Sequence, residues 1–192
     1  AMEVFWRKGF EATSLADLTA AMGINPPSLY AAFGDKERLF LEAASHYEAT
    51  RFALCPYTDE PTARAAVERL LAHLADELPS AEHPGCLMVM TMAISGASGE
   101  LKDALAKMRA EVRGRFRARI ERGIREGDVP AGAHSAALTD FYGAVISGMA
   151  LQARAGAGRK AMRAAAGQAL SLFPPVQGRH APARGKGQRA SR

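Results

Sequence analysis

The sequence has few of the residues that mark secreted, membrane-spanning or metal-binding proteins. Its two cysteines, Cys55 and Cys86, are too few for a disulfide framework and fit a reducing cytoplasm. No window reaches the roughly 18 apolar residues that a membrane-spanning helix needs, and no signal peptide is visible. Zinc-ligand spacings, a phosphate loop and the pattern H-E-x-x-H are also missing, and the histidines are scattered. We therefore expect a cytoplasmic protein with no metal, no cofactor, no membrane partner and no enzymatic activity.

Aromatic residues are also scarce, at 7% of the chain, whereas alanine, leucine and arginine are abundant. Unbranched side chains lose little conformational freedom in a helix, so this composition favours helices over sheets. Apolar residues make up 48% of the chain, which is enough for a packed core. Because no stretch alternates convincingly between apolar and polar residues, we expect an all-α fold.

The net charge of +5 is concentrated at the C-terminus. The segment Gln177–Arg192 contains five basic residues and no acidic residue, so the rest of the chain sums to zero. The first fifty residues hold four basic and seven acidic side chains, which gives a net charge of −3. If this N-terminal region binds nucleic acid, it must do so through a few well-placed groups rather than through bulk charge.

Apolar residues at helical spacing, punctuated by glycine and proline, predict where the helices lie. The expected N-terminal helices are Ala1–Lys8, whose start we expect to be missing, Ser14–Met22, Pro26–Phe33 and one that begins at Asp35. The expected later helices are Thr62–Leu78, Glu100–Glu126, Ser135–Ala155 and Arg159–Phe173. Between them, Gly85–Ala97 is apolar nearly all round and should be buried. From Pro174 onward we expect disorder, because proline, glycine and arginine dominate.

Two of the short helices are joined by a turn of three residues, Gly23-Ile24-Asn25. A turn of that length sets two helices near a right angle, and the second can then enter a major groove. Gly23 suits the left-handed conformation that closes the first helix, and Ser14 with Asp17 resembles a capping box. Asn25 can cap the second helix, whose first turn tolerates Pro26 because the amides there have no helical partner. The segment therefore predicts a helix-turn-helix.

A more specific pattern lies between Gly9 and Phe40, where the sequence reads G-F-x-x-T-S-L-x-x-L-x-x-x-x-G-I-N-x-x-S-L-Y-x-x-F-G-x-K-x-x-L-F. This run resembles the N-terminal DNA-binding domain of the TetR family of repressors. The family hallmark L-Y-x-x-F followed by K is present as Leu29-Tyr30, Phe33 and Lys36. The resemblance implies a helix-turn-helix domain over residues 1–46, a helical ligand-binding and dimerisation domain over 47–173, and a basic tail over 174–192.

The resemblance also implies roles for individual residues. Phosphate contacts are implied for Ser14 and Thr13, for Tyr30 through its hydroxyl, and for Lys36 with help from a helix dipole. Base edges would be faced by the residues that start the recognition helix: Asn25, Pro26, Pro27 and Ser28. Taken singly, Tyr30 fits a half-buried tyrosine and Lys36 a solvated lysine, so only the joint spacing carries the interpretation.

The side chains at the recognition positions are shorter than those that are common in the family. The exposed set is expected to be Asn25, Ser28, Ala31 and Ala32 with the two prolines, where longer polar side chains are common. Asparagine can read adenine through two hydrogen bonds, and proline or alanine can touch a thymine methyl group. We expect DNA shape to contribute to recognition, because these side chains are short. The basic arm that often precedes the first helix is absent from this sequence.

In the resembling family the C-terminal helices form a ligand pocket and a dimer interface. Small residues let helices approach closely and support a dimer interface here. Packing within one chain is the alternative. The small residues are Gly143, Ser147 and Gly148, followed by Ala161, Ala165 and Ala169. Candidates for the pocket are adaptable or aromatic side chains, which plain core packing would also explain: Met88, Met92, Phe116, Phe141, Tyr142 and Met149.

Two other features have both a functional and an ordinary interpretation. Cys86 lies at an expected helix start, where the dipole would lower the pKa of the thiol and suit an oxidation or electrophile sensor. A buried, inert cysteine is the alternative. The arginines from Arg109 to Arg122 are interpreted as a solvated face with Glu111 and Glu121 rather than as a second nucleic-acid site.

The main hypothesis is a homodimeric repressor that places two recognition helices in successive major grooves of a palindromic operator and is released by a small, largely apolar effector. The alternative is a DNA-binding regulator that senses oxidation at Cys86. A third class is a helical ligand-binding or enzymatic protein with no role on DNA, which would show no salt-dependent duplex binding.

Overall fold

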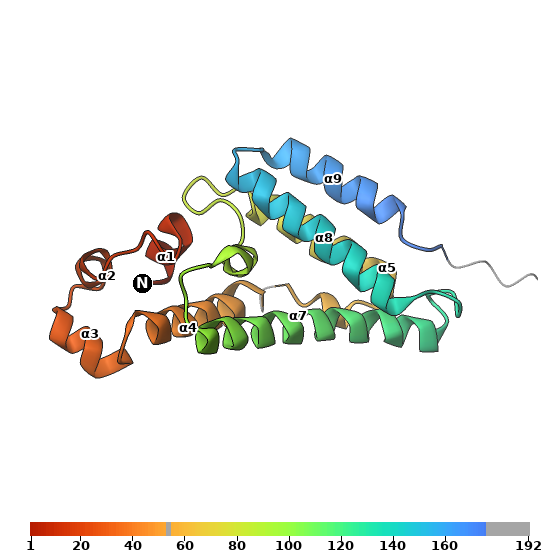
Figure 1. Cartoon of the computed structure of the whole chain (residues 1–192). Coiled ribbons are helices and arrows are strands. Elements are labelled where there is room, and N and C mark those ends of the chain that lie inside the picture. The colour runs from red at the N-terminus through yellow and green to blue at the C-terminus, as the bar shows by residue number, and fades with distance from the viewer. Residues whose placement is uncertain (53–54, 176–192) are drawn as a thin grey trace, which may run out of the picture.

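The computed structural model describes residues 1–52 and 55–175, and within these ranges every regular element is a helix (Figure 1). The expected all-α fold is therefore confirmed. The N-terminal helices are α1 (Met2–Lys8), α2 (Leu15–Met22), α3 (Pro26–Phe33) and α4 (Lys36–Tyr47). The later α-helices are α5 (Ala63–Glu77), α6 (Leu87–Met90), α7 (Gly99–Glu126), α8 (Ser135–Arg154) and α9 (Arg159–Ser171). Short π or 3-10 helices are η1 (Glu48–Phe52), η2 (Tyr57–Asp59) and η3 (Thr91–Ala93).

Capping side chains define the ends of the N-terminal helices. The Oγ of Ser14 accepts a hydrogen bond from the Asp17 amide at 3.1 Å, and the Asp17 carboxylate accepts one from the Ser14 amide at 3.0 Å. This is the capping box that the sequence predicts. Gly23 ends α2 with a φ of 66°, a left-handed conformation that residues with a side chain rarely adopt. Asn25 and Asp35 cap α3 and α4 through their side-chain oxygens. The caps therefore fix the direction in which α3 leaves α2.

Aromatic rings fill the space between α1 and α4. Phe5 lies edge-on to Phe40 with 4.9 Å between ring centroids, and it stacks on Phe10 at 6.4 Å. Trp6 lies edge-on to Tyr47 at 4.8 Å. All five residues are buried. Because such ring pairs stabilise beyond the area they bury, these contacts hold the helix-turn-helix as a rigid unit on α4.

The later helices pack in layers beside the N-terminal group (Figure 1). Helix α7 runs alongside α4 and beneath α8, while α9 packs against α5. Helix α7 buries Leu101, Leu105, Phe116 and Ile120, which recur at helical spacing along one side of the helix. Helix α4 thus reaches from the helix-turn-helix into the larger group of helices.

The end of α7 contains one buried arginine, an exception to the expected solvated face, on which Arg113, Arg115 and Arg117 are exposed. Arg119 is only 3% exposed, and its Nη2 donates a hydrogen bond to the Glu60 carbonyl at 3.0 Å. The Asp128 carboxylate lies 3.8 Å from the same nitrogen and also accepts hydrogen bonds from the Ala63 amide at 3.2 Å. The arginine is buried because α7 turns this face toward η2 and the start of α5, where free carbonyl and amide groups need partners.

The segment Gly85–Ala97 is less buried than expected. It forms only the four-residue helix α6 and the 3-10 helix η3, and the side chain of Met92 is 59% exposed. The segment is too short to form a helix that is covered on all sides, although it contacts α4, α8 and, through Thr91, Arg109 of α7. Among the described residues no helix is long and apolar enough to cross a membrane. The disorder expected from Pro174 onward falls almost entirely on residues outside the described ranges.

Candidate nucleic-acid interface and ligand cavity

The start of α3 projects from the molecule and is exposed to solvent. Asn25, Pro26, Pro27 and Ser28 are all exposed, whereas Leu29 behind them is fully buried. The two prolines occupy the first two helical positions, where their missing N–H groups cost no hydrogen bond. These residues are the four that the sequence assigns to base edges, and the structure brings them together on one exposed helix end.

The cap of α3 limits what Asn25 can offer to a base. Its Oδ1 accepts a hydrogen bond from the Ser28 amide at 2.9 Å. Reading adenine through two hydrogen bonds needs both the carbonyl oxygen and the amide nitrogen of the side chain. Because Oδ1 already accepts from the Ser28 amide, its second lone pair and the two N–H donors of Nδ2 remain for a base, and the cap fixes the direction from which Asn25 can make contact.

Tyr30 and Lys36, for which the family resemblance implies phosphate contacts, differ in how far they reach into solvent. The side chain of Tyr30 is 47% exposed. Lys36 is half-buried at the first position of α4, and its Nζ lies 4.6 Å from the centroid of the Phe10 ring. The aromatic face fixes the ammonium group beside the N-terminus of α4, where a phosphate would also meet the positive end of the helix dipole.

The two residues at the start of α2 are placed differently from each other. Ser14 is exposed, and its hydroxyl both caps α2 and donates to the Asp17 carboxylate at 2.8 Å. Thr13 is only 1% exposed, and its hydroxyl donates to the Gly9 carbonyl at 2.6 Å. The phosphate contact suggested for Thr13 is therefore corrected: its side chain ties α2 to the end of α1 and is closed off from a ligand.

The charge near the start of α2 is balanced locally. The Lys8 side chain donates a hydrogen bond to the Asp17 carboxylate at 2.6 Å. This hydrogen bond, together with those from Ser14, holds the pKa of Asp17 well below its usual range. Asp17 therefore stays ionised at neutral pH and keeps both the cap and the Lys8 contact in place.

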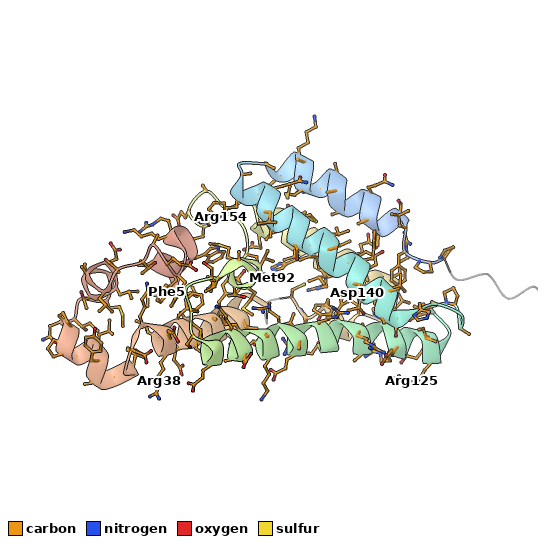
Figure 2. The ribbon with its side chains drawn as sticks, in the orientation of Figure 1. Phe5, Arg38, Met92, Arg125, Asp140 and Arg154 are labelled. Carbon is orange, nitrogen blue, oxygen red and sulfur yellow. The ribbon has the colours of Figure 1, made fainter. Side chains whose placement is uncertain are left out.

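A cavity of about 490 Å³ lies in the larger group of helices, lined by residues of η2, α5, α6, η3, α7 and α8. Its size falls in the usual range for small-molecule sites. Most of the wall is apolar, and Met88, Met92 and Phe116 line it as the sequence suggests. Figure 2 shows Met92 beside α6 and Asp140 on the side of α8 that faces α7. No group of described His, Cys, Asp or Glu residues is arranged to hold a metal ion.

The other three residues suggested for a pocket lie elsewhere. Tyr142 is buried against α9, where its hydroxyl donates to the Ala169 carbonyl at 3.1 Å, and burial raises its pKa to about 12. Met149 is buried, and Phe141 is 37% exposed on the outer face of α8. The helix turns about 100° per residue, so the face that lines the cavity, with Thr139 and Asp140, leaves these three on other sides.

Sequence reasoning missed the charged part of the cavity wall. Arg109 and Arg113 of α7 and Asp140 of α8 all line it. Arg109 and Arg113 are four residues apart in α7, as are Val112 and Phe116. This spacing places all four side chains on one side of the helix. The sequence contains this spacing, but spacing alone does not distinguish an arginine that lines a cavity from a solvated one.

Cys86 also lines the cavity, in surroundings that contradict the expected reactivity. The Tyr47 hydroxyl donates a hydrogen bond to its Sγ at 3.3 Å, and burial raises the pKa of the Cys86 thiol. The expected lowering is wrong because α6 has only four residues and gives a weak dipole, while desolvation of the thiolate dominates. A thiol with a raised pKa is a poor nucleophile, which favours the inert, buried interpretation.

Carboxylates of the helix-turn-helix region hold the segment that follows η3. The Glu11 carboxylate accepts hydrogen bonds from the amides of Ser95 at 2.9 Å and Gly96 at 3.3 Å. The Glu37 carboxylate accepts one from the Ser98 amide at 2.8 Å and another from the Ser98 hydroxyl. The segment Ser95–Ser98 therefore contacts α4 and the turn between α1 and α2. It begins only three residues after Met92, which lines the cavity.

A further contact joins the far end of α8 to α1. Arg154 donates hydrogen bonds to the carbonyls of Trp6 and Arg7, each at 3.1 Å. Figure 2 shows Arg154 where the end of α8 passes close to α1. The helix-turn-helix is thus held from two sides, by the α6–α7 segment and by α8, and both of these elements line the cavity.

Comparisons with known proteins agree over nearly the whole chain. The family model described as bacterial regulatory proteins, tetR family, matches residues 1–43, and the one described as tetracyclin repressor-like, C-terminal domain, matches residues 63–169. The chain is 32% identical over 182 residues to the HTH-type transcriptional repressor ComR of Escherichia coli (strain K12), covering 92% of this chain and 86% of ComR. It is 46% identical over 70 residues to the repressor BdcR of the same organism, covering 35% of this chain and 36% of BdcR.

Solved structures show the same likeness. A cysteine mutant of the TetR family transcriptional regulator CifR, complexed with a 26-bp operator, is 41% identical, with a TM-score of 0.84 and coverage of 91% of this chain and 93% of that one. A TetR regulator from Rhodococcus sp. RHA1 is 37% identical, with a TM-score of 0.62 and coverage of 90% and 95%. The resemblance found in the helix-turn-helix is confirmed by matches to both halves: the chain belongs to the TetR family of bacterial regulatory proteins.

Proposed function

We propose that this protein is a repressor that binds a palindromic operator as a homodimer and is released by a small, largely apolar effector in the cavity. The observation that carries the proposal is the physical link between the two sites. The wall of the cavity continues, within a few residues, into the segment held by Glu11 and Glu37 of the helix-turn-helix region. An effector that shifts this wall would change the position of α3.

On DNA, the exposed start of α3 would enter the major groove. Asn25, Pro26, Pro27 and Ser28 would face base edges, while Tyr30, Lys36 and Ser14 would contact phosphates. The short side chains at these positions favour contacts with thymine methyl groups and a contribution from DNA shape. Two regulators that resemble this chain support the role on DNA, since CifR was solved with its operator and ComR is named as a repressor.

The dimer would form through the outer faces of α8 and α9. Phe141, Gly148 and Leu151 follow each other at spacings of seven and three residues on α8, and the two large side chains are 37% and 58% exposed. Gly167 of α9 and Leu172, which directly follows that helix, are also exposed. A Cβ built on Gly148 or Gly167 would meet nothing within 4 Å, so a second copy has room to approach these backbones closely.

Sedimentation of a charged variant tests the dimer. The wild-type chain should sediment at twice its mass of 20.4 kDa, whereas Leu151→Glu should be monomeric at micromolar concentration and should lose operator affinity. The matched control is Ala118→Glu, at an exposed position on α7, which should behave as wild type. A Leu151→Glu protein that stays dimeric would remove α8 from the interface.

Genomic operator selection with purified protein tests the role on DNA. We expect one enriched palindrome, and we expect Tyr30→Phe and Lys36→Ala each to weaken it by about tenfold, because each removes one phosphate contact. Lys36→Ala should also reduce the slope of log affinity against log salt by about 1. The control is Lys107→Ala, which removes an exposed lysine of α7 and should leave binding unchanged.

Two outcomes would contradict the proposal. No enriched sequence would mean that the helix-turn-helix has been misinterpreted. Binding that disappears only when the basic residues after Pro174 are removed would place the nucleic-acid contact in the tail instead.

A Cys86→Ser variant separates the ligand hypothesis from the redox hypothesis, because a sensor of bound ligand should still respond to its effector.

A further inference from the structure

Three charged side chains line the otherwise apolar cavity, and one of them lacks a counter-ion. Arg113 of α7 forms an ion pair with Asp140 of α8 across the cavity wall. Arg109, one turn before Arg113, has no carboxylate of the described residues within ion-pair distance. The charged groups that line the cavity therefore sum to one unbalanced positive charge, at Arg109.

Arg109 also has unused hydrogen-bond donors. Its Nη1 donates to the Thr91 hydroxyl at 2.7 Å, and no other side-chain hydrogen bond joins it to the described residues. A guanidinium group carries five N–H donors in a rigid fork. Burial lowers the pKa of Arg109, yet an arginine side chain remains charged at any pH at which the protein is folded. A partly desolvated cation with spare donors thus faces the cavity.

The rest of the wall defines the body of a ligand. Met88, Met92, Phe116 and Ile146 surround the cavity, and flexible thioethers adapt to ligands of different shape. A cation would be repelled by Arg109, and a hydrocarbon would leave its donors unpaired. A carboxylate matches the guanidinium fork through two parallel hydrogen bonds, and this match is strengthened where water is excluded.

We propose that the effector is amphipathic, with a carboxylate or comparable anionic oxygen group bound by Arg109 and an apolar body in the remaining cavity. The inference rests on the proposed function, in which this cavity holds the effector. It adds the chemical class of the ligand and names the residue that selects it.

The same arginine connects recognition to the helix-turn-helix. The Thr91 hydroxyl, which accepts from Arg109, donates to the Met88 carbonyl at 2.7 Å and so helps to fold η3. A ligand carboxylate that takes the free donors of Arg109 draws the guanidinium toward the cavity and so weakens its hydrogen bond to Thr91. The segment that follows η3 leads directly to Ser95, whose amide binds Glu11. Binding of the anion thus loosens the contact between Ser95 and Glu11 that holds the helix-turn-helix. An uncharged ligand fills the cavity without this effect.

Calorimetric titration with a matched pair of probes tests the inference. Decanoate and 1-decanol share an alkyl chain and differ in charge. We expect wild type to bind decanoate at least about tenfold more tightly, and decanoate alone to release the operator. Arg109→Met should bind the two probes equally while keeping its affinity for 1-decanol, which also shows that the variant is folded. Arg109→Lys should keep part of the preference.

The control is Arg125→Met, near the far end of α7 and away from the cavity (Figure 2), which should retain the full preference. Equal binding of both probes to wild type overturns the anionic ligand but leaves a ligand-binding cavity in place. A preference that survives in Arg109→Met overturns the role of Arg109. Binding of neither probe, across carboxylates and alcohols of six to twelve carbons, overturns the inference together with the proposed ligand site.

Discussion

The N-terminal and the C-terminal helices fill their interiors in different ways. Between α1 and α4, the rings of Phe5, Phe10 and Phe40 pack with centroids 4.9 to 6.4 Å apart. The C-terminal helices instead border a cavity of about 490 Å³, and the Nε and Nη1 of buried Arg119 have no hydrogen-bond partner among the residues that the structure describes. The region that must hold base-contacting residues in a fixed geometry is tightly packed, and the region that would accept a ligand keeps space and adaptable methionines.

The largest effect that this contrast predicts is on stability. Phe5→Ala should lower the free energy of unfolding by about 3–5 kcal/mol, because it opens a new void among rings that cannot collapse. Phe116→Ala removes the same side chain from the wall of an existing cavity and should cost less, about 2 kcal/mol. Urea denaturation of both variants provides the measurement. Equal losses would mean that the two interiors are packed to the same degree.

Two helix caps sharpen the contrast at a smaller scale. Ser14→Ala and Thr62→Ala each remove a hydroxyl that caps a helix, of α2 and of α5, and each should cost about 1 kcal/mol. Operator affinity should distinguish them, because only Ser14 lies at the proposed phosphate contact. We expect Ser14→Ala to bind the operator several-fold more weakly than Thr62→Ala at equal protein stability. The same loss of affinity in both would mean that affinity follows stability alone.

The contrast also explains which features the sequence could predict. The helix-turn-helix depends on local signals, since capping pairs, a left-handed glycine and proline at a helix start act within a few residues. Ser14 with Asp17, Gly23 and Asn25 were accordingly predicted with their structural roles. Local reasoning failed only at Thr13, where the partner of the hydroxyl is a carbonyl at the end of the preceding helix.

The cavity depends on contacts between helices far apart in the sequence, which local patterns do not contain. Met and Phe at helical spacing identified Met88, Met92 and Phe116, but the same criterion selected Tyr142, which packs on α9 instead. Arg109 and Arg119 looked like their exposed neighbours, because burial of an arginine is decided by the helix that lies opposite. Only the assembled fold separates these cases.

The smallest predicted effect concerns the contact between the two regions. Hydrogen bonds from the Ser95 amide, and then from the Glu11 and Gly96 amides, lower the pKa of Glu11 from its ordinary value of 4.5. A carboxylate whose pKa is lowered by folding stabilises the folded state above the unfolded pKa, and this contribution is lost as the pH falls through the lower, folded pKa. The contact should therefore be intact at pH 7 and weaken only below about pH 4.5.

Amide proton shifts of Ser95 and Gly96, followed by NMR during acid titration, measure this contact directly. In the wild type they should titrate with a midpoint below 4.5, and in Glu11→Gln they should stay flat over the same range. A midpoint at or above 4.5 would show that the Glu11 carboxylate is not held by these amides, and the link between the two regions would then depend on other contacts, such as those of Glu37 and Arg154. With effector bound, a midpoint that rises toward 4.5 would mean that the ligand acts through this contact, because release of the amides removes the cause of the lowered pKa.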